Sequence, residues 1–253
     1  MSEFAGERIA KVIARAGLCS RRDAERLIEA ARVTLNGKTI RTAALNVTPG
    51  DVVRVDGKPL PHKEAARLWR YHKPEGLVVS HKDPQGRPTV FEKLREQLPR
   101  VVSIGRLDIN TEGLLLLTND GELARSLELP ASGWIRRYRV RAYGKVDDAL
   151  LAKIAKGVEI EGLRYGPVEA RIDQTRGDNA WLTLAITEGK NREVKKLCEY
   201  MGLTVNRLIR MSFGPFVLGE LARGEVAEVP PKMLREQLGA KFGGSHADRR
   251  RKV

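Results

Sequence analysis

One segment constrains this chain more than any other, residues 103–124, which read SIGRLDINTEGLLLLTNDGELA. Its pattern predicts a strand, a polar loop, a second, apolar strand, an Asp-Gly turn and a helix. The loop places Asp108 and Glu112 between two apolar runs. A carboxylate at the rim of an apolar sheet can act as a nucleophile or general base if a nearby cation keeps it ionised. Ordinary loop carboxylates are the alternative, and the pattern alone favours them.

The charge balance indicates the kind of partner. The chain has 253 residues, with 46 Lys and Arg against 32 Asp and Glu, and a net charge of +14. This length suggests one large or two modest domains, and 42% hydrophobic residues suffice for a packed core. A polyanion, above all a nucleic acid, is the partner that such a charge predicts. The alternative is a charge that merely prevents aggregation.

Several classes of protein are not expected. Cys19 and Cys198 stand apart, and no Cys or His cluster has metal-ligand spacing, so we expect buried thiols, a reducing compartment and no metal. No glycine-rich GxGxxG loop occurs, and we expect no cofactor. The first ten residues lack an apolar signal-peptide core, and no run of about 18 apolar residues could span a membrane. The expected location is the cytoplasm.

Residues 7–60 predict a small module of two helices followed by short strands. Apolar residues recur at helical spacing from Ile9 until Gly17, and Ser20 is typical of the start of a second helix. Asn36-Gly37 and Asp56-Gly57 are hairpin-turn signals. We expect residues 61–67 to be a linker.

The charges of this module are one-sided. Nine basic residues lie from Arg8 to Arg41, against only Asp23, Glu25 and Glu29. Solvated helix faces are the simpler explanation. The pattern of a helix, SRR, a second helix and LNG nevertheless resembles the S4 RNA-binding module. This resemblance implies that Arg21 and Arg22 grip RNA phosphates, with Lys11 and Arg15 on the face of the first helix.

Residues 68–235 predict a second domain. Its candidate strands and helices mix without a regular βαβ rhythm, so we expect an α+β domain around a mostly antiparallel central sheet. The candidate strands are LWRYH, VVSIGRL, GLLLLT, IRRYRVRAY and AWLTLAIT, and the candidate helices are GELARSLE, VDDALLAKIAKG and NREVKKLCEYMG. Residues 236–253 are expected to be a basic, disordered tail. We expect the chain to act as a monomer.

Five segments together resemble the ribosomal RNA pseudouridine synthases that carry an S4 module. They are GRLDINTEGLLLLTNDGELA, HKPEGLVVS, DPQGRPTVFEKL, RRYRV and EGKNREVKKL. The resemblance runs from residue 7 to about residue 230 and is closest to the enzymes of the large subunit. It implies isomerisation of a uridine in 23S ribosomal RNA to pseudouridine, in an S4 module followed by a synthase domain, without a cofactor.

The resemblance also implies roles for single residues. Asp108 falls on the catalytic aspartate of the family, and Arg106 would fill the gap that a flipped-out base leaves. Tyr138 would stack against the uracil, although its spacing alone fits a core aromatic. Strand alternation places Arg137, Arg139 and Arg141 on the other face, where they suit RNA.

Lys195 matches the family's basic partner of the aspartate. The large-subunit enzymes usually read REVRRL there, whereas this chain reads REVKKL, and a lysine supplies the charge without the planar fork of arginine. Lys196 and Arg192 are rival partners, and a lysine whose stem covers apolar surface is the simpler alternative. Leu208 matches an apolar position beneath the target base, and an ordinary core leucine explains it almost as well.

Three other functions compete with this interpretation. A non-catalytic RNA-binding or ribosome-assembly factor needs only the S4 module and the charge. An S4-bearing methyltransferase would need a glycine-rich cofactor loop. A synthase acting on 16S ribosomal RNA would carry nearly the same motifs, so the sequence leaves this alternative open.

Overall fold

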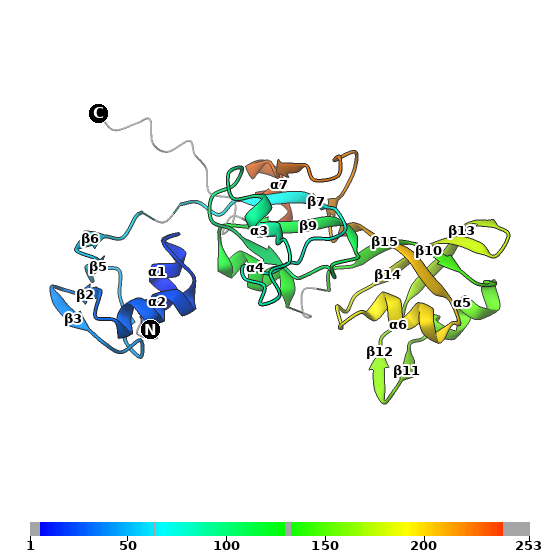
Figure 1. The fold of residues 1–253 in the computed structure, drawn as a ribbon, viewed down its shortest axis with the longest axis horizontal. Coiled ribbons are helices and arrows are strands. Elements are labelled where there is room, and N and C mark those ends of the chain that lie inside the picture. The colour runs from blue at the N-terminus through cyan, green and yellow to red at the C-terminus, as the bar shows by residue number, and fades with distance from the viewer. Residues whose placement is uncertain (1–5, 63, 130–132, 240–253) are drawn as a thin grey trace. The chain divides into compact units, whose positions relative to one another are not determined.

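The computed structural model describes residues 6–62, 64–129 and 133–239. The chain divides into two compact units after Ala66 (Figure 1). Residues 240–253, which hold most of the predicted basic tail, lie outside the described residues. Among the helices within the described ranges, none combines the length and apolar character that a membrane crossing requires.

The first unit contains two helices and two small antiparallel sheets. The first sheet has the order β3-β2-β5-β6, and β1 pairs with β4. The elements in chain order are β1 (Glu7–Arg8), α1 (Ile9–Arg15), α2 (Arg21–Glu29), β2 (Val33–Leu35), β3 (Lys38–Ile40), β4 (Asn46–Val47), β5 (Val53–Val55) and β6 (Lys58–Pro59).

The local signals in the sequence account for this unit. Ser20 is the N-cap of α2, and its side chain accepts a hydrogen bond from Asp23 N, as the sequence predicted. Asn36-Gly37 and Asp56-Gly57 both have positive φ angles and connect the hairpins β2–β3 and β5–β6. The core forms where Ile9 and Ile13 of α1 pack with Ile28 of α2 and the inward valines of the strands.

The second unit is larger and is built around one sheet. Its elements are β7 (Leu68–Lys73), α3 (Val90–Lys93), β8 (Val102–Ile104), β9 (Glu112–Thr118), α4 (Gly121–Glu128), β10 (Arg136–Tyr143), α5 (Asp148–Ala155), β11 (Val158–Ile160), β12 (Leu163–Tyr165), β13 (Glu169–Arg176), β14 (Asn179–Ile186), α6 (Glu193–Tyr200), β15 (Thr204–Phe213), β16 (Phe216–Val217), β17 (Val226–Glu228) and α7 (Pro231–Leu238).

The central sheet has the order β13-β14-β10-β15-β9-β7-β17, with β8 beside β9 and β16 beside β15. All of these pairs are antiparallel except β9 with β15, which run parallel. The predicted α+β class with a mostly antiparallel sheet is therefore confirmed. The separate hairpin β11–β12 lies outside this sheet (Figure 1).

The sheet between β13 and β15 has two different faces. Residues of β10 are alternately buried and exposed, with Tyr138, Val140 and Ala142 on the buried face. Leu151 of α5 and Leu197 of α6 belong to the same hydrophobic cluster as these residues, so both helices pack on that face. Arg137, Arg139 and Arg141 consequently point to the opposite face, whereas Arg136 is buried on the same face as Tyr138.

The parallel contact between β9 and β15 joins the two halves of the sheet. It consists of the pairs Ile209 with Glu112 and Arg210 with Gly113. Glu112 is buried, and it accepts two hydrogen bonds from Arg207 of β15, at 2.6 and 3.1 Å, while Arg223 lies 2.7 Å away. Burial alone would raise the pKa of Glu112, but these guanidinium groups outweigh it and hold the pKa below its ordinary value.

Three of the differences between the sequence-based assignments and the structure concern the C-terminal helix and two long strands. Helix α7 continues to Leu238, so residues 236–238 belong to this helix rather than to the predicted tail, because no helix-ending residue precedes Gly239. Two long strands, β13 and β15, were not predicted. β13 is mostly exposed and β15 is rich in polar residues, so neither presents the clean apolar alternation from which strands are recognised.

Gly113 offers a test of the junction. It has a φ of +100°, and a Cβ atom there would lie 2.7 Å from the backbone nitrogen of Arg210. We expect Gly113→Ala to lower the free energy of unfolding of the second unit by about 1–3 kcal/mol, because the strands must separate or the backbone must strain. Urea unfolding measures this change. Gly121→Ala is the control, since an added Cβ meets nothing within 4 Å there. Equal stability of both variants would contradict the close approach.

Candidate active site

A buried lysine holds the loop that carries Asp108. Lys73, the last residue of β7, is fully buried, and its Nζ lies within hydrogen-bonding distance of four backbone carbonyls, which share the three N–H groups of the ammonium ion. The acceptors are the oxygens of Pro74 at 3.0 Å, Asp108 at 3.1 Å, Ile109 at 3.2 Å and Thr111 at 2.9 Å. Three of these carbonyls belong to the loop between β8 and β9. The ammonium group therefore fixes the backbone from Asp108 to Thr111.

Burial changes the protonation of this lysine. It lowers the pKa of Lys73 from 10.5 to about 8, against the attraction of Asp108, Glu75 and Glu112, which raises it. The neutral amine has one N–H donor fewer than the ammonium ion, so it satisfies fewer of the four carbonyls. The hydrogen bonds that hold the Asp108 loop thus depend on an ammonium group that is half deprotonated near pH 8.

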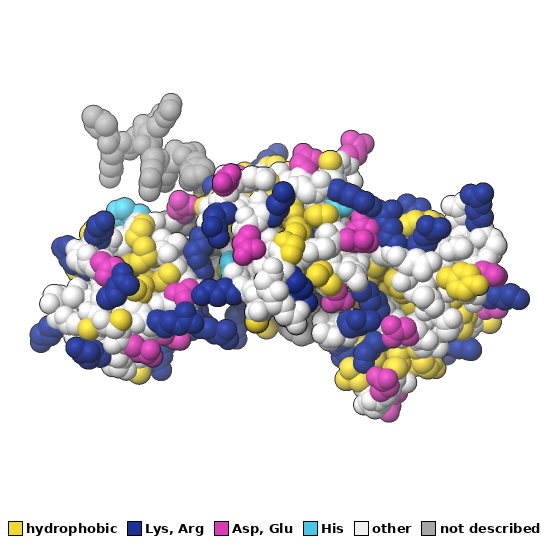
Figure 2. All heavy atoms as spheres, in the orientation of Figure 1, with side chains coloured by type: hydrophobic (Ala, Val, Ile, Leu, Met, Phe, Trp, Pro, Cys, Tyr) yellow, Lys and Arg dark blue, Asp and Glu magenta, His cyan; other side chains and the backbone are white. Residues whose placement is uncertain are grey.

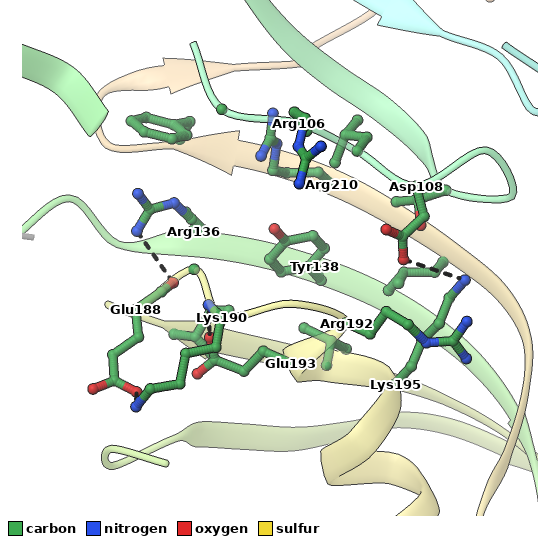
Figure 3. A pocket seen from close by; sticks show the side chains of 18 of the residues that line it. Arg106, Asp108, Arg136, Tyr138, Glu188, Lys190, Arg192, Glu193, Lys195 and Arg210 are labelled. Atoms are coloured by element: carbon green, nitrogen blue, oxygen red, sulfur yellow. Dashed lines mark hydrogen bonds and ion pairs between the residues drawn. The ribbon is translucent and has the colours of Figure 1, made fainter. Parts of the chain in front are cut away.

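Asp108 and Lys195 form an ion pair at the pocket. Lys195 Nζ lies 3.6 Å from Asp108 Oδ2, and the side chains are 14% and 39% exposed, respectively (Figure 3). Asp108 comes from the loop before β9, whereas Lys195 comes from α6, on the other half of the sheet. The neighbouring cations have other partners, since Lys196 pairs with Glu161 at 3.1 Å and Arg192 with Glu199 at 3.7 Å. The structure therefore pairs Asp108 with Lys195 rather than with either rival.

The pocket beside this pair has a volume of about 450 Å³. Tyr138 and Leu208 line it, and both are at least nine-tenths buried. Leu208 pairs with Val140 and Arg210 with Tyr138 across β15 and β10, which places all four side chains on one face of the sheet. Arg106 lines the pocket as well but is exposed. A pocket with an aromatic wall, an aliphatic wall and an ion pair can hold a planar polar ring next to a carboxylate.

Two buried arginines, Arg136 and Arg210, line the other end of the pocket. Arg136 donates to the carbonyl oxygens of Thr187 at 2.8 Å and Glu188 at 3.2 Å, and its guanidinium lies 4.6 Å from the ring centre of Phe213. Arg210 donates from Nε to Leu114 O at 2.7 Å. Glu128, Glu188 and Glu193 line the same pocket, and Glu193 and Glu128 act electrostatically on Arg136, so this end carries charges of both signs (Figure 3).

The described residues contain no group of three His, Cys, Asp or Glu side chains that could hold a metal ion. Cys198 is buried in the core, and burial raises the pKa of its thiol to about 12. A thiol with this pKa is protonated at neutral pH and is a poor nucleophile.

The four basic residues predicted to bind RNA in the first unit fall into two groups. Lys11 and Arg15 of α1 both pair with Glu7, at 2.8 and 2.5 Å, so an acidic partner just before the helix lowers their net charge. Arg21 and Arg22 are exposed in the first turn of α2. Lysine and arginine side chains are prominent on the surface of this unit (Figure 2).

Comparison with known proteins identifies the family. Residues 67–200, more than half of the chain, match the family described as RNA pseudouridylate synthase, and residues 7–53 match the S4 domain. The chain belongs to the RNA pseudouridylate synthase family. It is therefore an isomerase that acts on uridine in RNA, and its S4 domain is an RNA-binding domain.

Whole-length relatives support this membership. An RNA pseudouridine synthase of Rickettsia felis, itself uncharacterised, is 47% identical over 91% of this chain and 100% of the relative. Ribosomal large subunit pseudouridine synthase B of Escherichia coli strain K12 is 41% identical over 89% of this chain and 85% of the relative. A crystal structure of a pseudouridylate synthase matches 91% of this chain and 99% of its own, with a TM-score of 0.63 and 27% identity.

Three buried basic residues of this site had no role in the sequence analysis. Lys73, Arg136 and Arg210 each occupy a buried position in or at the end of a strand. A lysine or arginine on the same face of a strand as apolar residues is a usable signal, because a charge buried there needs several hydrogen-bond partners. Those partners are backbone carbonyls, which the sequence cannot reveal.

The protonation of Lys73 leads to a pH prediction. We expect kcat to fall above about pH 8 as the ammonium ion loses its proton and the Asp108 loop loosens. The free energy of unfolding should not fall over the same pH range. A pKa that is lower in the folded state means that the unfolded chain holds this proton more tightly. The contribution of Lys73 to the free energy of unfolding therefore rises between about pH 8 and pH 10.5.

Rate profiles and unfolding curves over this pH range separate the two effects. Lys73→Met should lower kcat at pH 7 and lack the decline above pH 8, whereas Lys232→Met, on an exposed lysine of α7, should behave like the wild type. A decline that persists unchanged in Lys73→Met would assign it to another group.

Proposed function

We propose that this enzyme isomerises a specific uridine of 23S ribosomal RNA to pseudouridine, in the cytoplasm and as a monomer. The observation that carries the proposal is the Asp108–Lys195 ion pair at the rim of a pocket walled by Tyr138 and Leu208. The choice of 23S RNA is supported by the 41% identity to a relative named for the large ribosomal subunit.

The reaction defines what the pocket must do. Pseudouridine formation breaks the bond between C1′ and N1, turns the uracil and joins C1′ to C5, and the proton on C5 is lost while N1 regains one. Substrate and product are isomers, so no external group or electron is needed. The base must leave the RNA stack first, because C1′ and the ring faces are shielded there.

We assign the steps as follows. Asp108 acts through its carboxylate, either by attack at the sugar or ring or by removal of a proton. Lys195 keeps that carboxylate ionised where the base excludes water. Tyr138 stacks against the uracil, Leu208 packs beneath it, and Arg106 occupies the gap that the base leaves in the RNA.

The two units have different tasks in this proposal. The S4 domain holds RNA through phosphate contacts, in which the exposed Arg21 and Arg22 of α2 take part, with Lys11 and Arg15 nearby. The synthase unit performs the chemistry. Because Glu7 pairs with both Lys11 and Arg15, these two residues are expected to contribute less to RNA binding than Arg21 and Arg22.

Replacement of Asp108 tests the chemistry. We expect Asp108→Asn to abolish tritium release from 23S transcripts labelled at C5 of uridine, since an amide has nearly the same shape but is uncharged and a poor nucleophile. RNA binding and folding should remain. Asp148→Asn, on an exposed residue at the start of α5, is the control and should keep full activity. Near-normal release by Asp108→Asn would refute the assignment. Release from 16S rather than 23S transcripts would move the substrate to the small subunit.

Lys195 has a matched control next to it. We expect Lys195→Met to lower kcat about 10²-fold, comparable to the loss of one fixed electrostatic contact in other active sites. Lys195→Arg should keep more activity, because it retains the charge. Lys196→Met should change little, since Lys196 pairs with the exposed Glu161. Equal rates for Lys195→Met and Lys196→Met would contradict the role of the ion pair.

A further inference from the structure

The face of the sheet opposite the pocket carries a row of arginines. Along β10, Tyr138 and Val140 point to the pocket and the core, whereas Arg137, Arg139 and Arg141 alternate with them and are exposed. Alternate residues of a strand lie about 6.7 Å apart on one face. This regular spacing resembles the separation of successive phosphates along an RNA strand.

Neighbouring strands extend this row. Arg139 pairs with Thr183 of β14, which pairs with Arg171 of β13, so the three side chains share one face. Arg141 pairs in the same way with Trp181. We call this region the outer sheet surface, and its members are Arg137, Arg139, Arg141, Arg171, Asp173, Arg176, Trp181 and Thr183.

Its charge is strongly positive. Asp173 lies 3.0 Å from Arg171 and 4.0 Å from Arg139, and it also accepts a hydrogen bond from Thr183 at 2.8 Å. This one carboxylate is therefore shared between two arginines. Arg139 and Arg171 remain 46% and 75% exposed despite these contacts. The arginines of the outer sheet surface outnumber its carboxylates, even when Glu169 at the start of β13 is included.

Trp181 holds one of these arginines in place. The Arg139 guanidinium lies 4.6 Å from the centre of the indole ring. Such stacking fixes the plane of the guanidinium and leaves the edges that carry its N–H groups able to donate. A pre-oriented guanidinium loses less entropy when it binds phosphate, and an indole in an open sheet face can also stack against a base.

We propose that the outer sheet surface binds the phosphate backbone of a second RNA segment, distinct from the segment whose uridine enters the pocket. The pocket and the outer sheet surface lie on opposite faces of one sheet, so one short stem-loop would not reach both. The inference rests on the proposed function and deepens it, because it makes a large folded ribosomal RNA, rather than an isolated stem-loop, the substrate.

A charge-removal experiment measures the contribution of the surface. The variant combines Arg137→Gln, Arg139→Gln and Arg141→Gln, and the control combines Lys153→Gln, Lys156→Gln and Lys232→Gln, which remove the same charge from α5 and its C-terminal end and from α7. Affinity for a 23S transcript is measured over a range of KCl concentrations. We expect the slope of log K against log salt to flatten by about one unit per lost contact in the arginine variant only. Release of tritium at saturating RNA should be unchanged.

Photocrosslinking identifies the occupant. A benzoylphenylalanine placed at Thr183, in the middle of the outer sheet surface, should crosslink in cells to ribosomal RNA nucleotides outside the stem that contains the modified uridine. Crosslinks mainly to a protein, or an equal loss of salt dependence in the lysine control, would overturn the proposal. Failure of the proposed function can be told apart from failure of this inference. In the first case the wild type itself would release no tritium from ribosomal RNA.

Discussion

The parallel contact between β9 and β15 is the constraint on which the site depends. It joins a half of the sheet that supplies Asp108 to a half that supplies Tyr138 and, through α6, Lys195. The strands meet only because Gly113 has no side chain, and the buried Glu112 with Arg207 ties them together. Without this contact, Asp108 and Lys195 would lie on two unconnected parts of the sheet.

Two lysines act on the Asp108 carboxylate, one through its position and the other through its charge. Lys73 does not line the pocket, but its ammonium group donates hydrogen bonds to carbonyl oxygens of the loop. These bonds fix the position of Asp108. Lys195 lies 3.6 Å from the carboxylate itself. The proposed chemistry needs both, because a carboxylate must be positioned as well as ionised to react.

The sequence predicted those parts of the structure that local rules decide. Ser20 and the turns at Asn36-Gly37 and Asp56-Gly57 were found because a cap and a type of turn depend on neighbouring residues. Strand β15 was not predicted, because its polar residues are explained only by tertiary partners such as Glu112 and by the pocket. Lys73 was not predicted either, because its partners are carbonyls up to 38 residues away. The pairing of Asp108 with Lys195 came from motif register rather than from any local pattern.

We propose that Asp108, with Lys195 beside it, makes this chain a synthase of large-subunit ribosomal RNA. The most direct measurement is a map of pseudouridines in 23S and 16S RNA from a strain that lacks the gene. We predict that one pseudouridine of 23S RNA disappears in this strain and returns when the wild-type gene, but not the Asp108→Asn variant, is restored. Unchanged 23S RNA in the deletion strain, or restoration by Asp108→Asn, would contradict it.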